Sequence, residues 1–146
     1  LKGSEAPNSG FFSTSEVVVV DAKDVAGNKV LDIECFGPTG VVITYSDVSE
    51  VLEIISALDG ALVGSLFADA SEKDAPVLLE ALSAKVGRVA WNAWPTGVSV
   101  TAGQNHGGPY PASTSPLHTS VGIDAIHRFL RPVTFQGLPE DLILLL

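Results

Sequence analysis

Apolar positions along this chain occur either in short continuous runs or at helical spacing. The four valines within residues 16–21 and the run GVVITY at residues 40–45 are typical of strands buried on both faces of a sheet. Three further runs resemble them in length and in their apolar content. The pattern therefore predicts five strands in all, over residues 16–21, 40–45, 61–68, 88–91 and 133–136.

Apolar residues at a spacing of three and four predict three helices. Asp47 and Glu50 form a capping-box-like start for the first helix, which Gly60 ends. A second amphipathic stretch covers residues 71–85, and Pro76 must lie in its first turn, so the helix proper begins near Asp74. Gly87 follows as its expected end, and residues 123–130 predict the last helix.

The order of these elements predicts the fold class. Strands that alternate with helices indicate right-handed βαβ units, so we expect an α/β fold with a mostly parallel sheet. The alternation stops between residues 92 and 120, a stretch rich in Gly, Pro, Ser and Thr. Loops of this length without secondary structure are usually functional.

Composition narrows the class of protein. Of 146 residues, 46% are apolar and only 17% are charged, which argues against intrinsic disorder. The formal net charge of −9 argues against nucleic acid and anionic membranes as partners. The chain contains no methionine, and its low charge suggests that much of its surface is covered by other protein. We therefore expect a fragment of a larger protein.

Few side chains suggest chemistry by spacing alone. The three histidines, His106, His118 and His127, have no cysteine or carboxylate at ligand spacing, so no metal site is predicted. Neither a phosphate-binding Gly-Lys-Ser/Thr loop nor a Gly-x-Gly-x-x-Gly motif after a strand is present. The single cysteine, Cys35, fits a reducing cytoplasm. It is interpreted as a small apolar filler, with a thiol nucleophile as the alternative.

Four short motifs occur in a recognisable order. They are Gly10-Phe11-Phe12, Glu34-Cys35-Phe36-Gly37-Pro38, the strand Gly87 to Asn92, and His106-Gly107-Gly108-Pro109-Tyr110-Pro111-Ala112-Ser113. In this order they resemble the C-terminal third of NAD(P)-dependent aldehyde dehydrogenases. The last motif is similar to the branch that contains α-ketoglutarate semialdehyde dehydrogenases. The resemblance implies part of that family's catalytic domain, followed by an oligomerisation strand.

The resemblance also implies roles for single residues. Glu34 would bind the ribose of the nicotinamide and Phe36 would pack near the nicotinamide ring, the alternatives being a surface acid and an ordinary core residue. A carboxylate suits a ribose because its two oxygens accept from two hydroxyl groups. Trp94 would be a wall of the aldehyde entrance, or else an anchor for the loop. His106 would touch the substrate, or the glycines after it would fix the shape of the loop.

The family's cysteine nucleophile, general base and nucleotide-binding domain would lie before Leu1. No catalytic residue is therefore expected in this chain, which alone should be inactive, with Cys35 at a variable position. The complete enzyme would oxidise an aldehyde, with α-ketoglutarate semialdehyde as the expected one, using NAD or NADP. Residues 1–131 would belong to the catalytic domain, and residues 132–146 would form a strand and tail that pair with a neighbouring subunit.

The expected partners are thus a small aldehyde, the rest of the parent chain and a second subunit, without nucleic acid or membrane. The alternative is a free-standing, non-catalytic α/β module that binds a small ligand or assembles through its last strand. Such a self-sufficient module should carry more charge than 17% of its residues and should hide its apolar faces.

Overall fold

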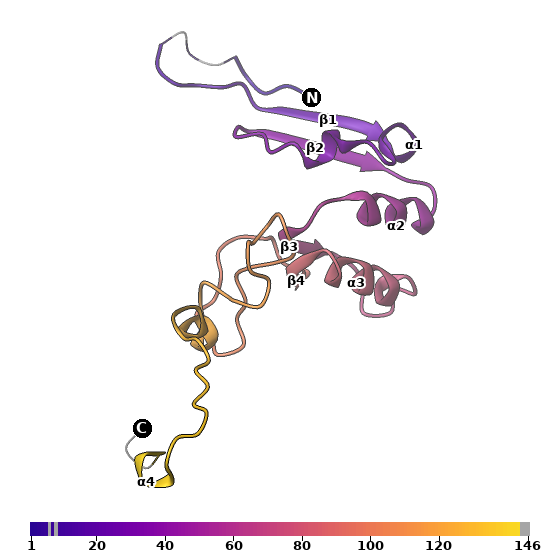
Figure 1. Ribbon diagram of the computed structural model, residues 1–146. Helices are drawn as coiled ribbons and strands as arrows, with labels where there is room; N and C mark the ends of the chain where they lie inside the picture. The colour runs from indigo at the N-terminus through magenta and orange to yellow at the C-terminus, as the bar shows by residue number, and fades with distance from the viewer. Residues whose placement is uncertain (6, 8, 144–146) are drawn as a thin grey trace.

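The computed structural model describes residues 1–5, 7 and 9–143, and strands alternate with helices along most of this chain (Figure 1). Two short 3-10 segments accompany the strands and α-helices. In chain order the elements are β1 (Glu16–Asp21), α1 (Ala22–Val25), η1 (Lys29–Asp32), β2 (Thr39–Thr44), α2 (Val48–Ala57), β3 (Ala61–Leu66), α3 (Ala75–Ser83), β4 (Val86–Trp91), η2 (Ile123–Phe129) and α4 (Glu140–Ile143).

The strands form two parallel pairs. β1 pairs with β2 from Glu16 opposite Thr39 onward, and β3 pairs with β4 from Ala61 opposite Val86 onward. The predicted parallel α/β fold is confirmed. Among the described residues, however, β2 and β3 do not pair, so the strands lie in two two-stranded sheets instead of one. Helix α2 makes the connection between the two pairs (Figure 1).

The helices begin as the sequence predicts. The Asp47 carboxylate accepts a hydrogen bond from the Ser49 amide at 2.8 Å, and the Glu50 carboxylate accepts one from the Ser46 amide at 2.8 Å. The first bond satisfies an amide that the first turn of α2 leaves without a partner, and the second joins the residue before the cap to that turn. In α3, Pro76 lies in the first turn, where its missing amide breaks no helical bond. Gly87 does not end this helix, because α3 stops at Ser83 and Gly87 lies within β4.

A small apolar core lies where β1, β2, α1 and α2 meet. Ala22, Val25 and Ile54 are buried there, and partly buried neighbours surround them: Val20, Leu31 and Ile43. The middle of the same strand pair is open, because Val19 is 56% exposed and its register partner Val42 is 48% exposed.

The prediction that these strands are buried on both faces is wrong for this chain. Val18 and Val19 are both exposed, at 41% and 56%. Successive residues of a strand point to opposite faces, so both faces of the pair are uncovered at this level. The described residues supply cover only near the end of the strands, around Ala22 and Ile54.

The predicted strand at residues 133–136 is also wrong for the isolated chain. This segment has no regular secondary structure, and Val133 and Phe135 are 55% and 57% exposed. A strand needs a neighbour for its amides and carbonyls, and within the described part of the chain this segment has none. It runs away from the two sheets toward α4 (Figure 1). The predicted helix before it forms as the 3-10 segment η2.

Candidate functional site

Glu34 lies between the end of η1 and the start of β2, beside an open hollow of about 700 Å³. We call this space the Glu34 hollow. Segments far apart in the sequence line it, from η1, the start of β3 and the long loop: Leu31, Asp32, Glu34, Leu58, Asp59, Gly60, Ala61, Leu62, Val63, Pro111 and Ala112. Two of the four sequence motifs therefore meet at one place, because Glu34 belongs to one and Pro111 to another.

The residues after Glu34 form a tight, exposed turn. The Gly37 amide donates to the Cys35 carbonyl at 2.9 Å, and the Thr39 amide donates to the Gly37 carbonyl at 2.8 Å. Phe36 is 93% exposed and does not line the hollow, so the alternative of an ordinary core residue is wrong for this chain. Cys35 is exposed as well, which overturns its interpretation as a buried apolar filler. No element among the described residues packs over this turn.

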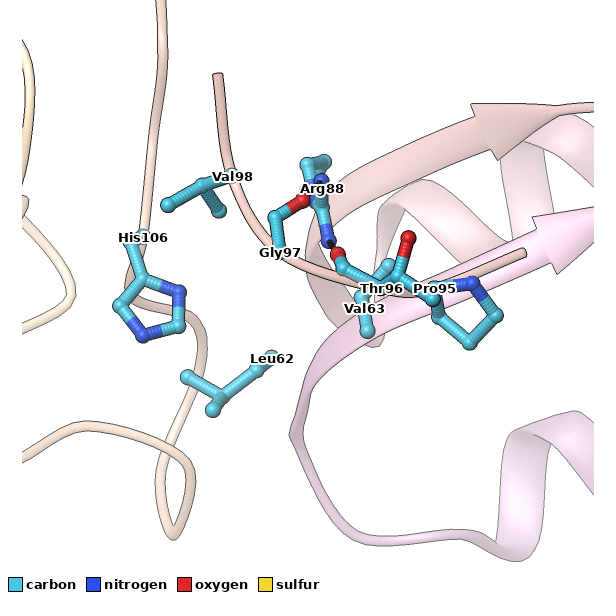
Figure 2. Close-up of a pocket in the computed structure, with 8 residues that line it drawn as sticks. All are labelled: Leu62, Val63, Arg88, Pro95, Thr96, Gly97, Val98 and His106. Carbon is cyan, nitrogen blue, oxygen red and sulfur yellow. Dashed lines mark hydrogen bonds between the residues drawn. The ribbon is translucent and has the colours of Figure 1, made fainter. Parts of the chain in front are cut away.

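His106 lines a second hollow, of about 350 Å³, which we call the His106 hollow (Figure 2). Most of its walls are apolar side chains or backbone, contributed by β3, β4 and the loop after β4. The lining residues are Leu62, Val63, Arg88, Pro95, Thr96, Gly97, Val98 and His106. Leu62 and Val63 also line the Glu34 hollow, so the two spaces share the start of β3.

Arg88 fastens the loop that closes one side of the His106 hollow. Its guanidinium donates to the Thr96 carbonyl at 2.9 Å and to the Gly97 carbonyl at 3.1 Å. The planar guanidinium presents its donors as a fork, so it can bind two successive carbonyls at once. Arg88 is not among the site residues predicted from the sequence. A charged residue inside an otherwise apolar strand was the signal that could have found it.

Trp94 does not line either hollow. Its side chain is 77% exposed, and its ring lies 5.4 Å from the ring of Phe67 at an angle of 56°. Such a tilted aromatic pair is a favourable contact and joins the loop to the end of β3. In this chain Trp94 therefore contacts the segment that follows β3, and its role as a wall of an aldehyde entrance stays a prediction.

The Gly-Gly-Pro loop crosses the starts of β3 and β4 at very short range. A side chain on Gly87 would overlap the backbone of Gly107, and one on Gly60 would lie 2.6 Å from the Tyr110 carbonyl oxygen. Only glycine permits so close an approach of two backbones. The Asn105 side chain adds a hydrogen bond to the Gly87 carbonyl at 2.9 Å. The loop thus has a defined shape although it contains no helix or strand.

Further hydrogen bonds hold the loop to itself. The His106 amide donates to the Thr119 hydroxyl at 2.8 Å, and the Ser120 amide donates to the His106 carbonyl at 3.1 Å. Thr119 is only 6% exposed. These bonds hold the backbone amide and carbonyl of His106. The backbone that carries the imidazole is therefore held in place at the edge of the His106 hollow.

Asn92 directly follows β4, and its side chain binds the backbone of the segment that follows β3. Its side chain accepts from the Ala68 amide and donates to the Ala68 carbonyl, both at 2.9 Å. An amide side chain can replace a backbone peptide in this way because it carries the same donor and acceptor. The pair marks the point where the chain leaves the sheet and enters the long loop.

Among the residues that the structure describes, no three His, Cys, Asp or Glu side chains are grouped so that they could hold a metal ion. In the same part of the chain, no helix combines the length and the apolar character needed to cross a membrane.

Comparison with known proteins assigns the family. The sequence profile of the aldehyde dehydrogenase family matches residues 2–134. The chain belongs to this family. Within the aldehyde dehydrogenases it is 46% identical to alpha-ketoglutaric semialdehyde dehydrogenase 2 of Azospirillum brasilense, over 98% of this chain and 27% of that protein. It is 42% identical to alpha-ketoglutaric semialdehyde dehydrogenase of Acinetobacter baylyi, over 82% of this chain and 23% of that protein.

The chain thus spans about a quarter of the length of these aldehyde dehydrogenases. The match confirms the resemblance carried by the four short motifs, both to the family and to the α-ketoglutarate semialdehyde dehydrogenase branch. It also gives the uncovered valines of β1 and β2 a context, because relatives of this kind contain far more protein than the 146 residues present here.

Proposed function

We propose that this chain is the C-terminal part of a cytoplasmic enzyme that oxidises α-ketoglutarate semialdehyde to its acid with NAD or NADP. The observation that supports the substrate is the identity of 46% along nearly the whole chain to a relative that bears this activity in its name. The family supports the reaction class. The two hollows that meet at β3 supply the space for a cofactor and an aldehyde side by side.

Glu34 is proposed to bind the ribose next to the nicotinamide. Glu34 is exposed and lines the Glu34 hollow, and no described residue donates a hydrogen bond to its carboxylate. Two free acceptor oxygens fit the two hydroxyl donors of a ribose. The exposed ring of Phe36 offers a flat apolar face for the nicotinamide. When bound, NAD(P)+ supplies the acceptor for the hydride of the aldehyde.

The aldehyde is proposed to approach through the His106 hollow, with His106 and Trp94 along its path. The walls formed by Leu62, Val63 and Val98 suit an aliphatic chain. Arg88 holds the far wall in place through its bonds to the loop carbonyls. The chain's own residues thus bind and orient the substrate, and in this proposal they perform no covalent step.

The covalent step is assigned to a part of the enzyme outside these 146 residues. Cys35 is the single cysteine of this sequence, and its exposed turn brings no hydrogen-bonding base to the thiol among the described residues. A thiol nucleophile needs such a base or another source of activation. We therefore expect residues 1–146 alone to be inactive.

Residues 132–146 are proposed to act in assembly, and residues 1–131 to belong to the catalytic domain. Val133 and Phe135 are more than half exposed, and the backbone between them has no strand partner in the described chain. Pairing with the sheet of a second subunit would satisfy that backbone and cover these side chains. The rest of the parent chain is the second expected partner, since it would cover β1 and β2.

The rival proposal, a free-standing module that binds a ligand without catalysis, has less support. Its apolar side chains should be covered, yet Val19, Val41 and Val42 remain about half exposed at the centre of a sheet. A stable independent domain buries such residues because their burial is the main source of its stability.

The test of the cofactor site is Glu34→Gln in the full-length enzyme. The amide keeps the size of the side chain but loses the charge and one acceptor. We expect kcat/KM for NAD(P)+ to fall about tenfold or more, as for loss of a charged hydrogen bond. Glu53→Gln, an exposed carboxylate on α2, is the matched control and should change nothing. Equal kinetics for the Glu34 variant and the control would contradict the role of Glu34.

A further inference from the structure

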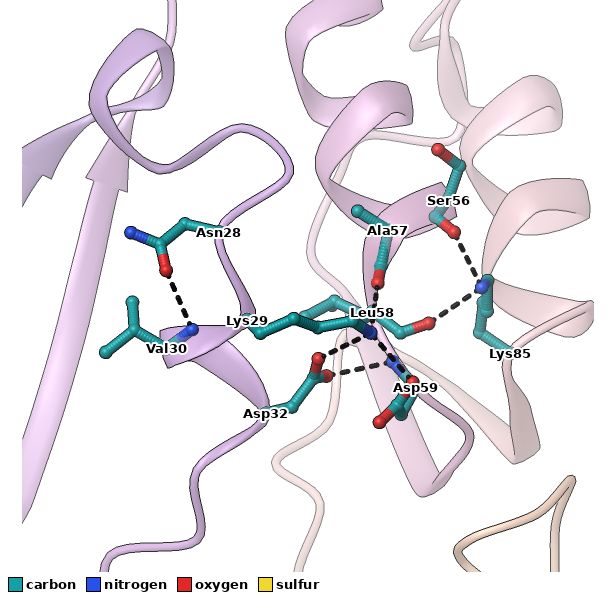
Figure 3. A network of polar contacts seen from close by, with 9 residues as sticks. All are labelled: Asn28, Lys29, Val30, Asp32, Ser56, Ala57, Leu58, Asp59 and Lys85. Atoms are coloured by element: carbon teal, nitrogen blue, oxygen red, sulfur yellow. Dashed lines mark hydrogen bonds and ion pairs between the residues drawn. The ribbon is translucent and has the colours of Figure 1, made fainter.

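Three charged side chains meet at the C-terminal end of α2 (Figure 3). The Lys29 ammonium lies 3.0 Å from the Asp32 carboxylate and 2.9 Å from the Asp59 carboxylate. It also donates to the Ala57 carbonyl at 3.3 Å. Lys29 thus uses its three donors on three acceptors, two of which come from a segment about 30 residues away. We call Lys29, Asp32 and Asp59 the α2-end cluster.

The second oxygen of Asp32 binds backbone. It accepts a hydrogen bond from the Asp59 amide at 2.9 Å, so one carboxylate joins Lys29 to the chain that enters β3. The hydrogen bond from the Asp59 amide and the Lys29 ammonium lower the pKa of Asp32. The Asp59 and Asp32 carboxylates raise the pKa of Lys29. Lys29 and Asp32 are therefore both charged across the neutral range.

A second lysine, Lys85, binds the carbonyls at the end of α2. The Lys85 ammonium donates to the Ser56 and Leu58 carbonyls, both at 2.7 Å. The last carbonyls of a helix have no partners within it, and cations are favoured at that end. Helix α2 has no basic residue in its own last turn, so lysines from η1 and from the loop before β4 take this role.

The α2-end cluster lies directly beside Glu34. Asp32 is the last residue of η1, and Glu34 follows two positions later. Asp32, Glu34 and Asp59 all line the Glu34 hollow. Between Asp32 and β2, the turn has local backbone bonds within residues 35–39, and the Pro38 carbonyl accepts a hydrogen bond from the Glu16 amide of β1 at 3.0 Å. The bond from the Asp59 amide to Asp32 is thus the contact nearest to Glu34 in the sequence that joins this segment to the chain entering β3.

We propose that Lys29, Asp32 and Asp59 are positioning residues that hold Glu34 at the wall of the cofactor hollow. This inference rests on the proposed function, because it concerns the same carboxylate and the same ribose. Binding groups must be held close to the productive geometry, and a displacement of about 1 Å can cost up to a hundredfold in rate. A four-residue 3-10 segment such as η1 has too few bonds of its own to provide that rigidity.

A stabilising surface ion pair is the ordinary interpretation of such contacts. Exposed pairs contribute little to stability, and they usually join two side chains only. The α2-end cluster differs because it binds a backbone amide and a backbone carbonyl as well. It therefore fixes the relative position of two chain segments, which an exposed pair of side chains does not.

The experiment uses the full-length enzyme with Lys29→Met, which keeps the aliphatic stem and removes the three donors. We expect KM for NAD(P)+ to rise about three- to tenfold, while kcat and KM for the aldehyde change less than about twofold. Lys29→Arg keeps two charged donors for the carboxylates and should stay within about twofold of the wild type. Lys23→Met on α1 is the matched control and should leave all three constants unchanged.

A second variant separates loss of positioning from loss of folding. Asp59→Asn keeps the backbone amide that binds Asp32 and removes only one of the two charged partners of Lys29. We expect a smaller rise in KM for NAD(P)+, about twofold to threefold, because two of the three bonds between the segments remain: Lys29 to the Ala57 carbonyl, and the Asp59 amide to Asp32. Cofactor affinity measured by fluorescence titration should follow the same order: wild type, Asp59→Asn, Lys29→Met.

The outcomes separate this inference from the proposed function. A wild-type enzyme without aldehyde-dependent NAD(P)H formation contradicts both. An active wild type whose cofactor KM and affinity are unchanged in Lys29→Met and Asp59→Asn overturns the positioning role alone. A lower melting temperature with unchanged cofactor KM would assign the cluster to stability only, and would likewise overturn it.

Discussion

The strand pairs β1–β2 and β3–β4 have the same parallel geometry but differ in what covers them. Along β3 and β4 most side chains are partly buried, because α3 packs on this pair and the Gly-Gly-Pro loop crosses its start. Along β1 and β2 the central valines are about half exposed. The difference indicates that β3 and β4 find their cover within this chain. The uncovered β1 and β2 would need cover from other protein.

The largest expected effect comes from the covered pair. In Gly87→Ala the new methyl group would overlap the backbone of Gly107, so the loop must move or the strand must distort. Overpacking of this kind costs about 1–3 kcal/mol of unfolding free energy. We expect a lower melting temperature and faster proteolysis within residues 92–120 of the full-length enzyme.

Gly97→Ala is the matched control, because a methyl group at Gly97 meets nothing within 4 Å. It should change the unfolding free energy by less than about 0.5 kcal/mol. Equal melting temperatures for the two alanine variants would show that the loop does not lie against β4 as described.

The open pair is tested by a double substitution that should act differently in two contexts. Val19 and Val42 are register partners, so Val19→Thr with Val42→Thr changes one site on the sheet. In the 146-residue chain we expect weaker binding of a hydrophobic dye and little change in melting temperature. In the full-length enzyme we expect a loss of about 1 kcal/mol or more, because we expect the rest of the parent chain to cover the same valines.

Val100→Thr provides the control, since Val100 is 87% exposed in the long loop. An identical response of the double variant in both contexts would contradict the claim that the parent chain covers β1 and β2.

The sequence predicts what local patterns determine. The strand at residues 16–21 begins and ends as expected, the Asp47 cap forms, and Pro76 lies in a first turn. Each of these depends on neighbours within a few residues. The strand expected at residues 133–136 fails for the opposite reason, because no strand among the described residues pairs with it.

The site is less predictable because its contacts join distant segments. Lys29 and Asp59 meet across 30 positions, and Gly87 meets Gly107 through backbone alone. No periodicity connects such residues. The motif around Glu34 lies beside a hollow in the structure, but the connection of this segment to η1 and β3 required the three-dimensional arrangement.

A smaller effect is expected at the wall of the His106 hollow. Arg88→Gln removes the fork that binds the Thr96 and Gly97 carbonyls, so the loop loses its fixed position. We expect KM for the aldehyde to rise about three- to tenfold, with KM for NAD(P)+ nearly unchanged. Arg128→Gln in η2 is the matched control. A change in the cofactor constant in place of the aldehyde constant would contradict the division between the two hollows.

The smallest effect is a pH dependence of stability at the α2-end cluster. The pKa of Asp32 is lowered by the Asp59 amide and Lys29, with Lys85 nearby, so the carboxylate stabilises the fold above its unfolded pKa of about 3.9. That contribution disappears as the pH falls through the lower folded pKa. The pKa of Lys29 is raised, so its contribution persists below about 10.4 and disappears as the pH rises through the higher folded pKa.

Asp32→Asn should therefore be less stable than the wild type between these limits, and the difference should vanish in acid. Denaturant unfolding of both proteins at a series of pH values checks this. A difference that persists unchanged in strong acid would show that the charge of Asp32 is not what matters.

The central claim is that this chain supplies part of the binding site of an aldehyde dehydrogenase and none of its covalent chemistry. The direct measurement is NAD(P)H formation from α-ketoglutarate semialdehyde by the full-length enzyme and by residues 1–146, side by side. We predict steady turnover by the full-length enzyme and none by the 146-residue chain. Turnover by the short chain alone, or no turnover by the full-length protein, would contradict the account.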